Sequence, residues 1–114
     1  MHDLKKNLIQ SSTLYVVATP IGNLDDISRR ALNVVQQVDY VAAEDTRRTG
    51  QLLKYYDISN KCFALHKFNE AVTSNKVIKY LSSGKSIALV SDAGTPSISD
   101  PGRILVDRVL DSGF

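Results

Sequence analysis

Cysteine is nearly absent from this sequence, since Cys62 is the only one among 114 residues. A single thiol excludes a disulfide within the chain, and its place beside an apolar stretch indicates a packing role in a reducing compartment. Histidine is scarce as well, with His2 near the amino terminus and His66 in the interior of the sequence. One cysteine and two histidines make no ligand set, so we expect no metal site.

Long apolar runs are also missing. Nowhere do about 18 apolar residues follow one another, and the amino end has no apolar core long enough for a secretion signal. We therefore expect a cytoplasmic protein with no membrane partner. Charge of one sign is not in excess either, because the net charge is only +2. A value this small does not indicate nucleic-acid binding, which usually shows as a strong basic stripe.

The sequence does contain four short apolar runs rich in Val, Ile, Tyr, Phe and Ala, at residues 14–18, 40–43, 62–65 and 86–90. We interpret them as strands. Their apolar residues are almost continuous rather than alternating, which is typical of a parallel sheet covered by helices on both faces. The length leaves room for one core, so the predicted fold class is a single α/β domain with a mainly parallel sheet.

Helical patterns fill the gaps between these runs. Apolar residues at helical spacing predict helices at about 27–38, 46–56, 77–83 and 101–112. Asp25 or Asp26 is placed to cap the first helix, and Gly84 can end the third in the left-handed conformation. Residues 1–12 are polar and patternless, so we expect a disordered tail followed by the domain at 13–114.

The end of the sequence repeats an earlier pattern. Ser83-Gly84-Lys85 follows the third helix and leads into a strand, whereas the chain stops at Ser112-Gly113-Phe114. We therefore expect the last strand of this domain to lie outside the sequence.

Each predicted strand ends in a chemically rich loop, at residues 19–23, 44–47, 66–70 and 91–96. Alternating strands and helices form right-handed crossovers, which bring all strand carboxyl ends to one edge of the sheet. Open α/β sheets bind their ligands at this edge. The four loops are therefore predicted to converge on one site.

The loop after the fourth strand is the most specific feature. In its Asp92-Ala93-Gly94-Thr95-Pro96 segment, Asp92 can accept hydrogen bonds and Gly94 leaves backbone groups open to a ligand. The alternative is a long turn whose Asp and Ser residues cap a helix. The turn at 20–22 has neither the Walker A nor the dinucleotide-binding glycine spacing, and it could be a plain strand-to-helix connection.

Two carboxylates and two guanidiniums begin the second helix. Glu44 and Asp45 could orient or deprotonate a hydroxyl group, while Arg47 or Arg48 holds a phosphate. The alternative is a helix cap with acids matched to the helix dipole and solvated arginines. His66 is equally open, since a histidine at a strand end can be a structural hydrogen-bonding group or a catalytic one.

Three motifs taken together carry a family resemblance: LYVVATPIGNLDD, AAEDTR and LVSDAGTPSISDPG. In this order they resemble the tetrapyrrole methylase superfamily, and in particular the branch that methylates the ribose 2′-oxygen of a cytidine in the 16S RNA of the small ribosomal subunit. Other members methylate porphyrin and corrin precursors. The resemblance covers residues 13–114.

The resemblance implies S-adenosyl-L-methionine as the cofactor, bound in a cleft between two α/β domains. The cofactor-binding positions that match the superfamily are Pro20, Asp92, Ala93, Gly94, Thr95 and Ile98. The second domain is absent from this sequence, so the fragment alone should bind the cofactor weakly and turn over poorly or not at all. Members of the superfamily commonly form homodimers, which is the oligomeric state we expect.

The chemistry that this resemblance implies needs a proton acceptor for the ribose hydroxyl, and alignment of the hydroxyl with the methyl group carries most of the rate. The candidates are Glu44, Asp45, Asp92 and Glu70, of which Glu44 and Asp45 are our predicted catalytic residues. The candidates for RNA phosphates are the arginines at 29, 30, 47 and 48, and Arg47 is best placed at the ligand edge.

Two other interpretations remain. One is a methylase of a different branch of the superfamily, acting on a tetrapyrrole or another small molecule. The first loop, which is poorer in glycine than is usual there, argues against a tetrapyrrole. The other is a receiver-like binding module without enzymatic activity. A receiver should end its third strand in an aspartate, whereas this strand ends in His66-Lys67.

Overall fold

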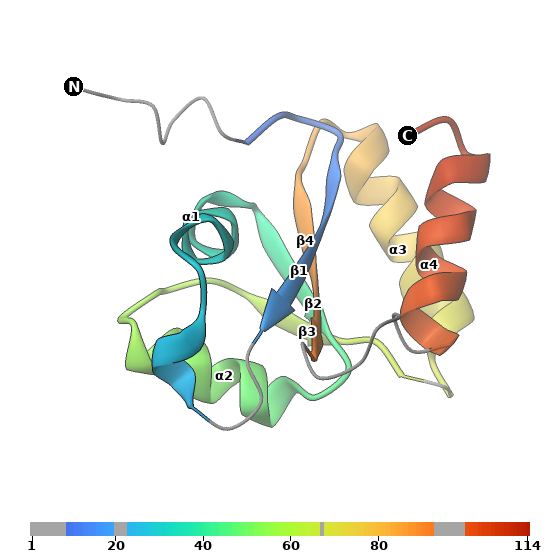
Figure 1. Ribbon diagram of the computed structural model, residues 1–114. Coiled ribbons are helices and arrows are strands. Elements are labelled where there is room, and N and C mark those ends of the chain that lie inside the picture. The colour runs from blue at the N-terminus through green and yellow to red at the C-terminus, as the bar shows by residue number, and fades with distance from the viewer. Residues whose placement is uncertain (1–8, 20–22, 67, 93–99) are drawn as a thin grey trace.

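The computed structural model describes residues 9–19, 23–66, 68–92 and 100–114. Strands and helices alternate along these residues, as Figure 1 shows. The strands are β1 (Leu14–Thr19), β2 (Tyr40–Ala43), β3 (Cys62–Ala64) and β4 (Ile87–Asp92). The helices are the 3-10 helix η1 (Leu24–Asp26) and the α-helices α1 (Arg29–Gln37), α2 (Thr46–Tyr55), α3 (Glu70–Ser82) and α4 (Asp100–Asp111).

The four strands form one parallel sheet in the order β1-β4-β2-β3. β4 lies between β1 and β2, with Thr19 opposite Asp92 in one pair and Ala43 opposite Val90 in the other. Because every pair is parallel, all four strands end at the same edge of the sheet. The predicted fold class is thereby confirmed.

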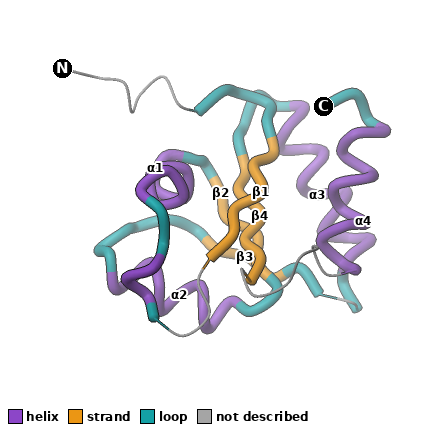
Figure 2. Tube along the Cα trace, in the orientation of Figure 1, coloured by secondary structure: helices purple, strands orange, loops and turns teal. Residues whose placement is uncertain are grey.

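Helices cover both faces of this sheet. α1 and α2 lie on one side and α3 and α4 on the other (Figures 1 and 2). Neighbouring residues of a strand point to opposite faces, so Val41 and Ala43 pack with α1 and α2 while Ala42 packs with α3 and α4. All three are buried. Burial on both faces explains why this strand is apolar at every position.

The first helix begins differently from the prediction. Its cap is Ser28, whose Oγ accepts a hydrogen bond from the Ala31 N–H at 3.1 Å. Asp25 and Asp26 instead belong to η1, which Asn23 caps by accepting from the Asp25 N–H at 3.0 Å. Both serine and aspartate are good caps, so composition alone did not distinguish them; the extra turn moves the start of the α-helix to Ser28.

The end of α3 matches the prediction. Gly84 has φ of +88°, and its N–H donates to the Leu81 carbonyl while the Lys85 N–H donates to the Tyr80 carbonyl. This pair of bonds satisfies the last carbonyl groups of the helix.

Residues 9–12 come from the segment that the sequence predicts as a disordered tail, but here they contact the domain. Ser12 donates from its Oγ to the Leu81 carbonyl at 2.7 Å and from its N–H to the Lys85 carbonyl at 3.1 Å. Ile9 packs against the core beside α1 and α2. Among residues 9–12 the contacts are made by backbone and hydroxyl groups and by one apolar side chain, which is too little to form an apolar pattern in the sequence.

Cys62 packs against the same core, as predicted for a structural thiol. Its partial burial raises the pKa of the thiol, because burial disfavours the thiolate. No helix within the described ranges combines the length and the apolar character that crossing a membrane requires.

Candidate functional site

The carboxyl edge of the sheet collects the predicted site residues. Asp92 is the last residue of β4, Glu44 directly follows β2, and His66 follows β3 by two positions. Because the strands are parallel, these three lie along one edge of the sheet, as predicted, while their convergence on one site stays a prediction. Pro20, which completed that prediction, lies outside the described residues.

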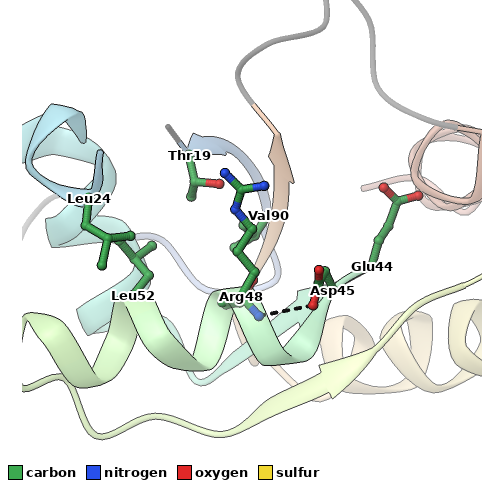
Figure 3. Close-up of a pocket in the computed structure, with 8 residues that line it drawn as sticks. Thr19, Leu24, Glu44, Asp45, Arg48, Leu52 and Val90 are labelled. Atoms are coloured by element: carbon green, nitrogen blue, oxygen red, sulfur yellow. Dashed lines mark hydrogen bonds between the residues drawn. The ribbon is translucent and has the colours of Figure 1, made fainter. Parts of the chain in front are cut away.

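The edge opens between neighbouring strands. After β1 the sequence continues to η1 and α1 on one face of the sheet, and after β4 it continues to α4 on the other face (Figure 1). Such a divergence creates the crevice in which open α/β sheets bind ligands. A small pocket lies there, lined by Thr19, Leu24, Glu44, Asp45, Arg48, Thr49, Leu52 and Val90 (Figure 3).

The pocket is small. Its cavity volume is about 20 Å³, close to the space that one water molecule needs. A site that encloses a whole cofactor usually measures several hundred Å³. The described residues at this edge therefore form one wall of a ligand site rather than an enclosed chamber.

Asp45 shapes the start of α2. It occupies the N-cap position, where its Oδ1 accepts a hydrogen bond from the Arg48 N–H at 3.0 Å. The helix cap that the sequence left open as an alternative is therefore present at Asp45. One carboxylate oxygen is engaged in holding the helix start.

Glu44 and Arg48 point to different parts of the edge. Figure 3 shows the Arg48 side chain extending toward Thr19 and Val90, and the Glu44 carboxylate directed away from it. Strand alternation places Glu44 on the same face as Ala42, the face that α3 and α4 cover. Glu44 is exposed and Arg48 is half-buried. The edge thus presents an acidic and a basic group at different places.

Arg47, the predicted phosphate-binding residue, is exposed on the first turn of α2 and does not line the pocket. Its neighbour Arg48 does. Both arginines were candidates from the sequence. Asp45 fixes where α2 begins, and the start of the helix determines which arginine faces the strand ends.

His66 takes part in a hydrogen-bonded turn. Its Nδ1 accepts from the Phe68 N–H at 3.3 Å, and its own N–H donates to Asn69 Oδ1 at 2.8 Å. Asn69 also donates from Nδ2 to the Ala64 carbonyl at 3.1 Å. The structural function that the sequence offered for His66 is therefore observed, and its exposed ring remains accessible at the edge.

Glu70, another candidate proton acceptor, is the first residue of α3. Its Oε2 is buried and has no hydrogen-bond partner among the described residues. It therefore stays a candidate beside Glu44.

Thr19, Leu24 and Thr49 line the pocket although the sequence did not mark them as site residues. Thr19 is buried, and its Oγ1 donates to the Ser91 carbonyl at 3.2 Å, which joins the ends of β1 and β4. A threonine at a strand end is too common to signal this function.

Two tyrosines hold the segment of Leu24 at the pocket: Tyr55, the last residue of α2, and Tyr56, the C-cap of that helix. Tyr56 donates from its hydroxyl to the Leu24 carbonyl at 2.6 Å, and Tyr55 donates to Asp25 Oδ1 at 2.7 Å. The hydrogen bond to the Asp25 carboxylate raises the pKa of Tyr55, and burial followed by the charge of Asp25 raises the pKa of Tyr56. These contacts fix η1 as the side of the pocket opposite Glu44 (Figure 3).

The predicted cofactor loop follows β4. Asp92 closes that strand opposite Thr19, while Ala93, Gly94, Thr95 and Ile98 lie outside the described residues. The end of β4 thus leads directly from the pocket into the predicted loop.

Comparison with known proteins identifies the relatives of this chain. Residues 13–114 match the family described as Tetrapyrrole (Corrin/Porphyrin) Methylases. The chain is 57% identical over 100 residues to Ribosomal RNA small subunit methyltransferase I of Vibrio cholerae, covering 88% of this chain and 35% of that protein. Proteins of the same name from Neisseria meningitidis serogroup B (52% identity, 93% and 36% covered) and Escherichia coli O157:H7 (54% identity, 89% and 35% covered) are similar.

A solved structure has the same fold. The crystal structure of uroporphyrin-III-C-methyltransferase from Thermus thermophilus superimposes with a TM-score of 0.67 at 16% identity, covering 90% of this chain and 44% of that one. The chain spans about a third of the length of the curated relatives it matches.

Proposed function

The chain belongs to the tetrapyrrole methylase family, and we propose that it is the amino-terminal part of a methyltransferase that acts on the ribose 2′-oxygen of a cytidine in small-subunit ribosomal RNA. The observation that carries this proposal is the identity of 52–57% to relatives named Ribosomal RNA small subunit methyltransferase I. At 16% identity, the likeness to the uroporphyrin methyltransferase supports the fold alone.

The proposed cofactor is S-adenosyl-L-methionine. When bound, it supplies a methyl group on a positively charged sulfur. The edge suits such a molecule because Glu44 and Asp45 bring negative charge, and Val90 and Leu24 bring apolar surface, to the same pocket. Pro20, Asp92, Ala93, Gly94, Thr95 and Ile98 are the proposed contacts.

A second domain completes the site in this proposal. The pocket of about 20 Å³ is far smaller than a cofactor site, and the relatives are about two and a half times as long as this chain. We refer to the protein of the relatives' length that carries this sequence as the complete protein. The 114 residues alone should bind the cofactor weakly and transfer no methyl group, and the complete protein should be a homodimer.

Glu44 is the proposed proton acceptor for the ribose hydroxyl. Its carboxylate is exposed at the strand ends, and the neighbouring Asp45 serves as the N-cap of α2, where its Oδ1 accepts from the Arg48 N–H. Asp45 then acts beside it by fixing the start of α2 and by adding negative charge. Arg47, exposed on the first turn of the same helix, is the proposed contact to an RNA phosphate.

The test compares two acceptors in the presence of labelled S-adenosyl-L-methionine. The complete protein is incubated with small ribosomal subunits that lack the modification and, separately, with a porphyrin precursor. We expect label in the ribosomal RNA only. Label in the porphyrin precursor and none in RNA would place the protein in another branch of the family and overturn the proposal.

A further inference from the structure

Phe68 is the most exposed large apolar side chain among the described residues, at 90% of its full accessible surface. It lies in the turn between β3 and α3, at the carboxyl edge of the sheet. An aromatic ring in this position contributes nothing to the core.

The turn that carries Phe68 is held by hydrogen bonds at both ends. The Phe68 N–H donates to His66 Nδ1, and Asn69 donates to the Ala64 carbonyl and accepts from the His66 N–H. The Thr73 N–H donates to the Asn69 carbonyl at 2.9 Å, which continues the turn into α3. The Phe68 ring is exposed to solvent, and it makes an edge contact with the His66 ring at a centroid distance of 6.4 Å.

The same turn begins next to the proposed proton acceptor. The Leu65 N–H donates to the Ala43 carbonyl at 2.8 Å, so the chain entering the turn runs beside the residue that precedes Glu44. Phe68 and Glu44 therefore follow neighbouring strands at the same edge of the sheet.

The described sequence neighbours of Phe68 are mostly polar. His66, Asn69 and Glu70 flank it in sequence, and Val72, at 74%, is the exposed apolar residue nearest to it in sequence. The other strongly exposed apolar side chains belong to β1, α2, α4 and the carboxyl end. A protein partner usually covers about 800 Å² on each side, whereas one flat ring among polar groups suits a single flat ligand.

We propose that Phe68, with the His66 ring at its edge, is a stacking platform for a base of the RNA substrate. Sequence-specific RNA recognition uses unstacked bases laid on aromatic side chains, and each such contact strengthens binding substantially. The inference rests on the proposed function, because it names the part of the RNA that the same site holds.

The test uses the absence of tryptophan from the sequence. Phe68→Trp gives the 114-residue chain a single tryptophan, at the platform, whose emission can be excited apart from that of the five tyrosines. An oligocytidine of about six nucleotides, within the usual site size for single strands, is titrated against an abasic ribose-phosphate oligomer of the same length. We expect quenching of the Trp emission by oligocytidine only. Equal responses to both oligomers would show that no base stacks there.

Affinity for the RNA substrate gives the second readout, measured on the complete protein. Phe68→Leu, which keeps an apolar side chain without a ring, should weaken binding of small ribosomal subunits between about 5-fold and about 150-fold. Phe68→Tyr should keep the affinity, and Val72→Ala is the matched apolar control that should leave it unchanged. If Phe68→Leu bound RNA with unaltered affinity, the proposed stacking platform would be overturned, whether or not the substitution also dissociated a dimer.

Failure of this inference can be told from failure of the proposed function. Methyl transfer by the unsubstituted protein, which carries Phe68, tests the function by itself. Transfer to RNA together with unaltered affinity in Phe68→Leu removes the platform and leaves the function standing.

Discussion

Glu44 and Asp45 are adjacent in the sequence, yet they have different surroundings. Asp45 accepts the Arg48 N–H as the cap of α2, while the Glu44 carboxylate extends from the strand end on the face of α3 and α4. A carboxylate that must accept a proton needs an oxygen within reach of the substrate. This difference is why we favour Glu44 over Asp45 as the proton acceptor.

The first prediction concerns this choice. In the complete protein, Glu44→Gln should lower kcat by about 10²- to 10⁴-fold, the usual contribution of a general base, with cofactor affinity nearly unchanged. Asp45→Asn should cost less, because asparagine caps a helix as well as aspartate does. Single-turnover methyl transfer measures both. A full rate in Glu44→Gln together with loss of the rate in Glu70→Gln would move the proton acceptor to the start of α3.

The second prediction separates the two arginines of α2. Arg47→Ala should weaken RNA binding and lower its salt dependence by about one unit of slope or slightly less, the signature of one lost phosphate contact. Cofactor affinity should survive, because the sulfonium offers the guanidinium no anion. Arg48→Ala is the comparison: Arg48 lines the pocket, so its loss should reduce turnover at saturating RNA. An unchanged salt slope in Arg47→Ala would contradict the assignment.

At the scale of elements, two glycines have different backbone conformations, one left-handed and one helical. Gly84 follows α3 with φ of +88°, and Gly50 lies inside α2. A Cβ atom added at either position would meet nothing within 4 Å. Backbone conformation alone therefore decides what an alanine does at each.

The third prediction follows from this pair. Gly84→Ala should lower the free energy of unfolding by about 1–2 kcal/mol, the cost of the left-handed conformation for a residue with a side chain. Gly50→Ala should raise it by about 0.5–1 kcal/mol, because alanine loses less entropy than glycine in a helix. Urea unfolding of the 114-residue chain measures both changes. Effects of equal sign would show that packing, and not backbone conformation, dominates at one of the two.

The fourth prediction concerns the contact between η1 and α2 and how its contribution to thermal stability depends on pH. Tyr55 donates to the Asp25 carboxylate, which holds the pKa of Tyr55 above its ordinary value of about 10. A raised pKa means that the contact contributes fully below about pH 10 and is lost as the pH rises through the raised pKa. Tyr55→Phe lacks the contact at every pH, so its Tm should fall less steeply above about pH 10 than that of the unsubstituted chain. Parallel curves would contradict this.

The elements themselves were largely predictable. Continuous apolar runs marked all four strands, because both faces of the sheet are buried, and Gly84 marked the end of α3. The start of α1 was not predictable, because Asp25, Asp26 and Ser28 are all good caps and only the turn of η1 selects Ser28. Phe68 gave no signal either, since its exposure depends on the turn that Asn69 holds.

At the scale of the whole molecule, topology placed the candidate site. Glu44, His66 and Asp92 are far apart in the sequence, but each stands at or just after the end of a strand. A parallel sheet therefore brings them to one edge. The residues that line the pocket could not be predicted from the sequence. Arg48 lines it and Arg47 does not, and this difference depends on the rotation of α2 about its axis. The small size of that pocket within the described residues was not predictable either, whereas a second domain is what the family resemblance already implies.

The central claim is that this edge serves methyl transfer to a ribose of ribosomal RNA, and locating the transferred methyl group tests it most directly. The complete protein is incubated with unmodified small ribosomal subunits and S-adenosyl-L-methionine, and the RNA is digested to nucleosides for mass spectrometry. The account predicts one new product, 2′-O-methylcytidine, which forms with the unsubstituted protein and is strongly reduced with Glu44→Gln. A methyl group on a base, or RNA that stays unmodified while the protein binds its cofactor, would contradict it.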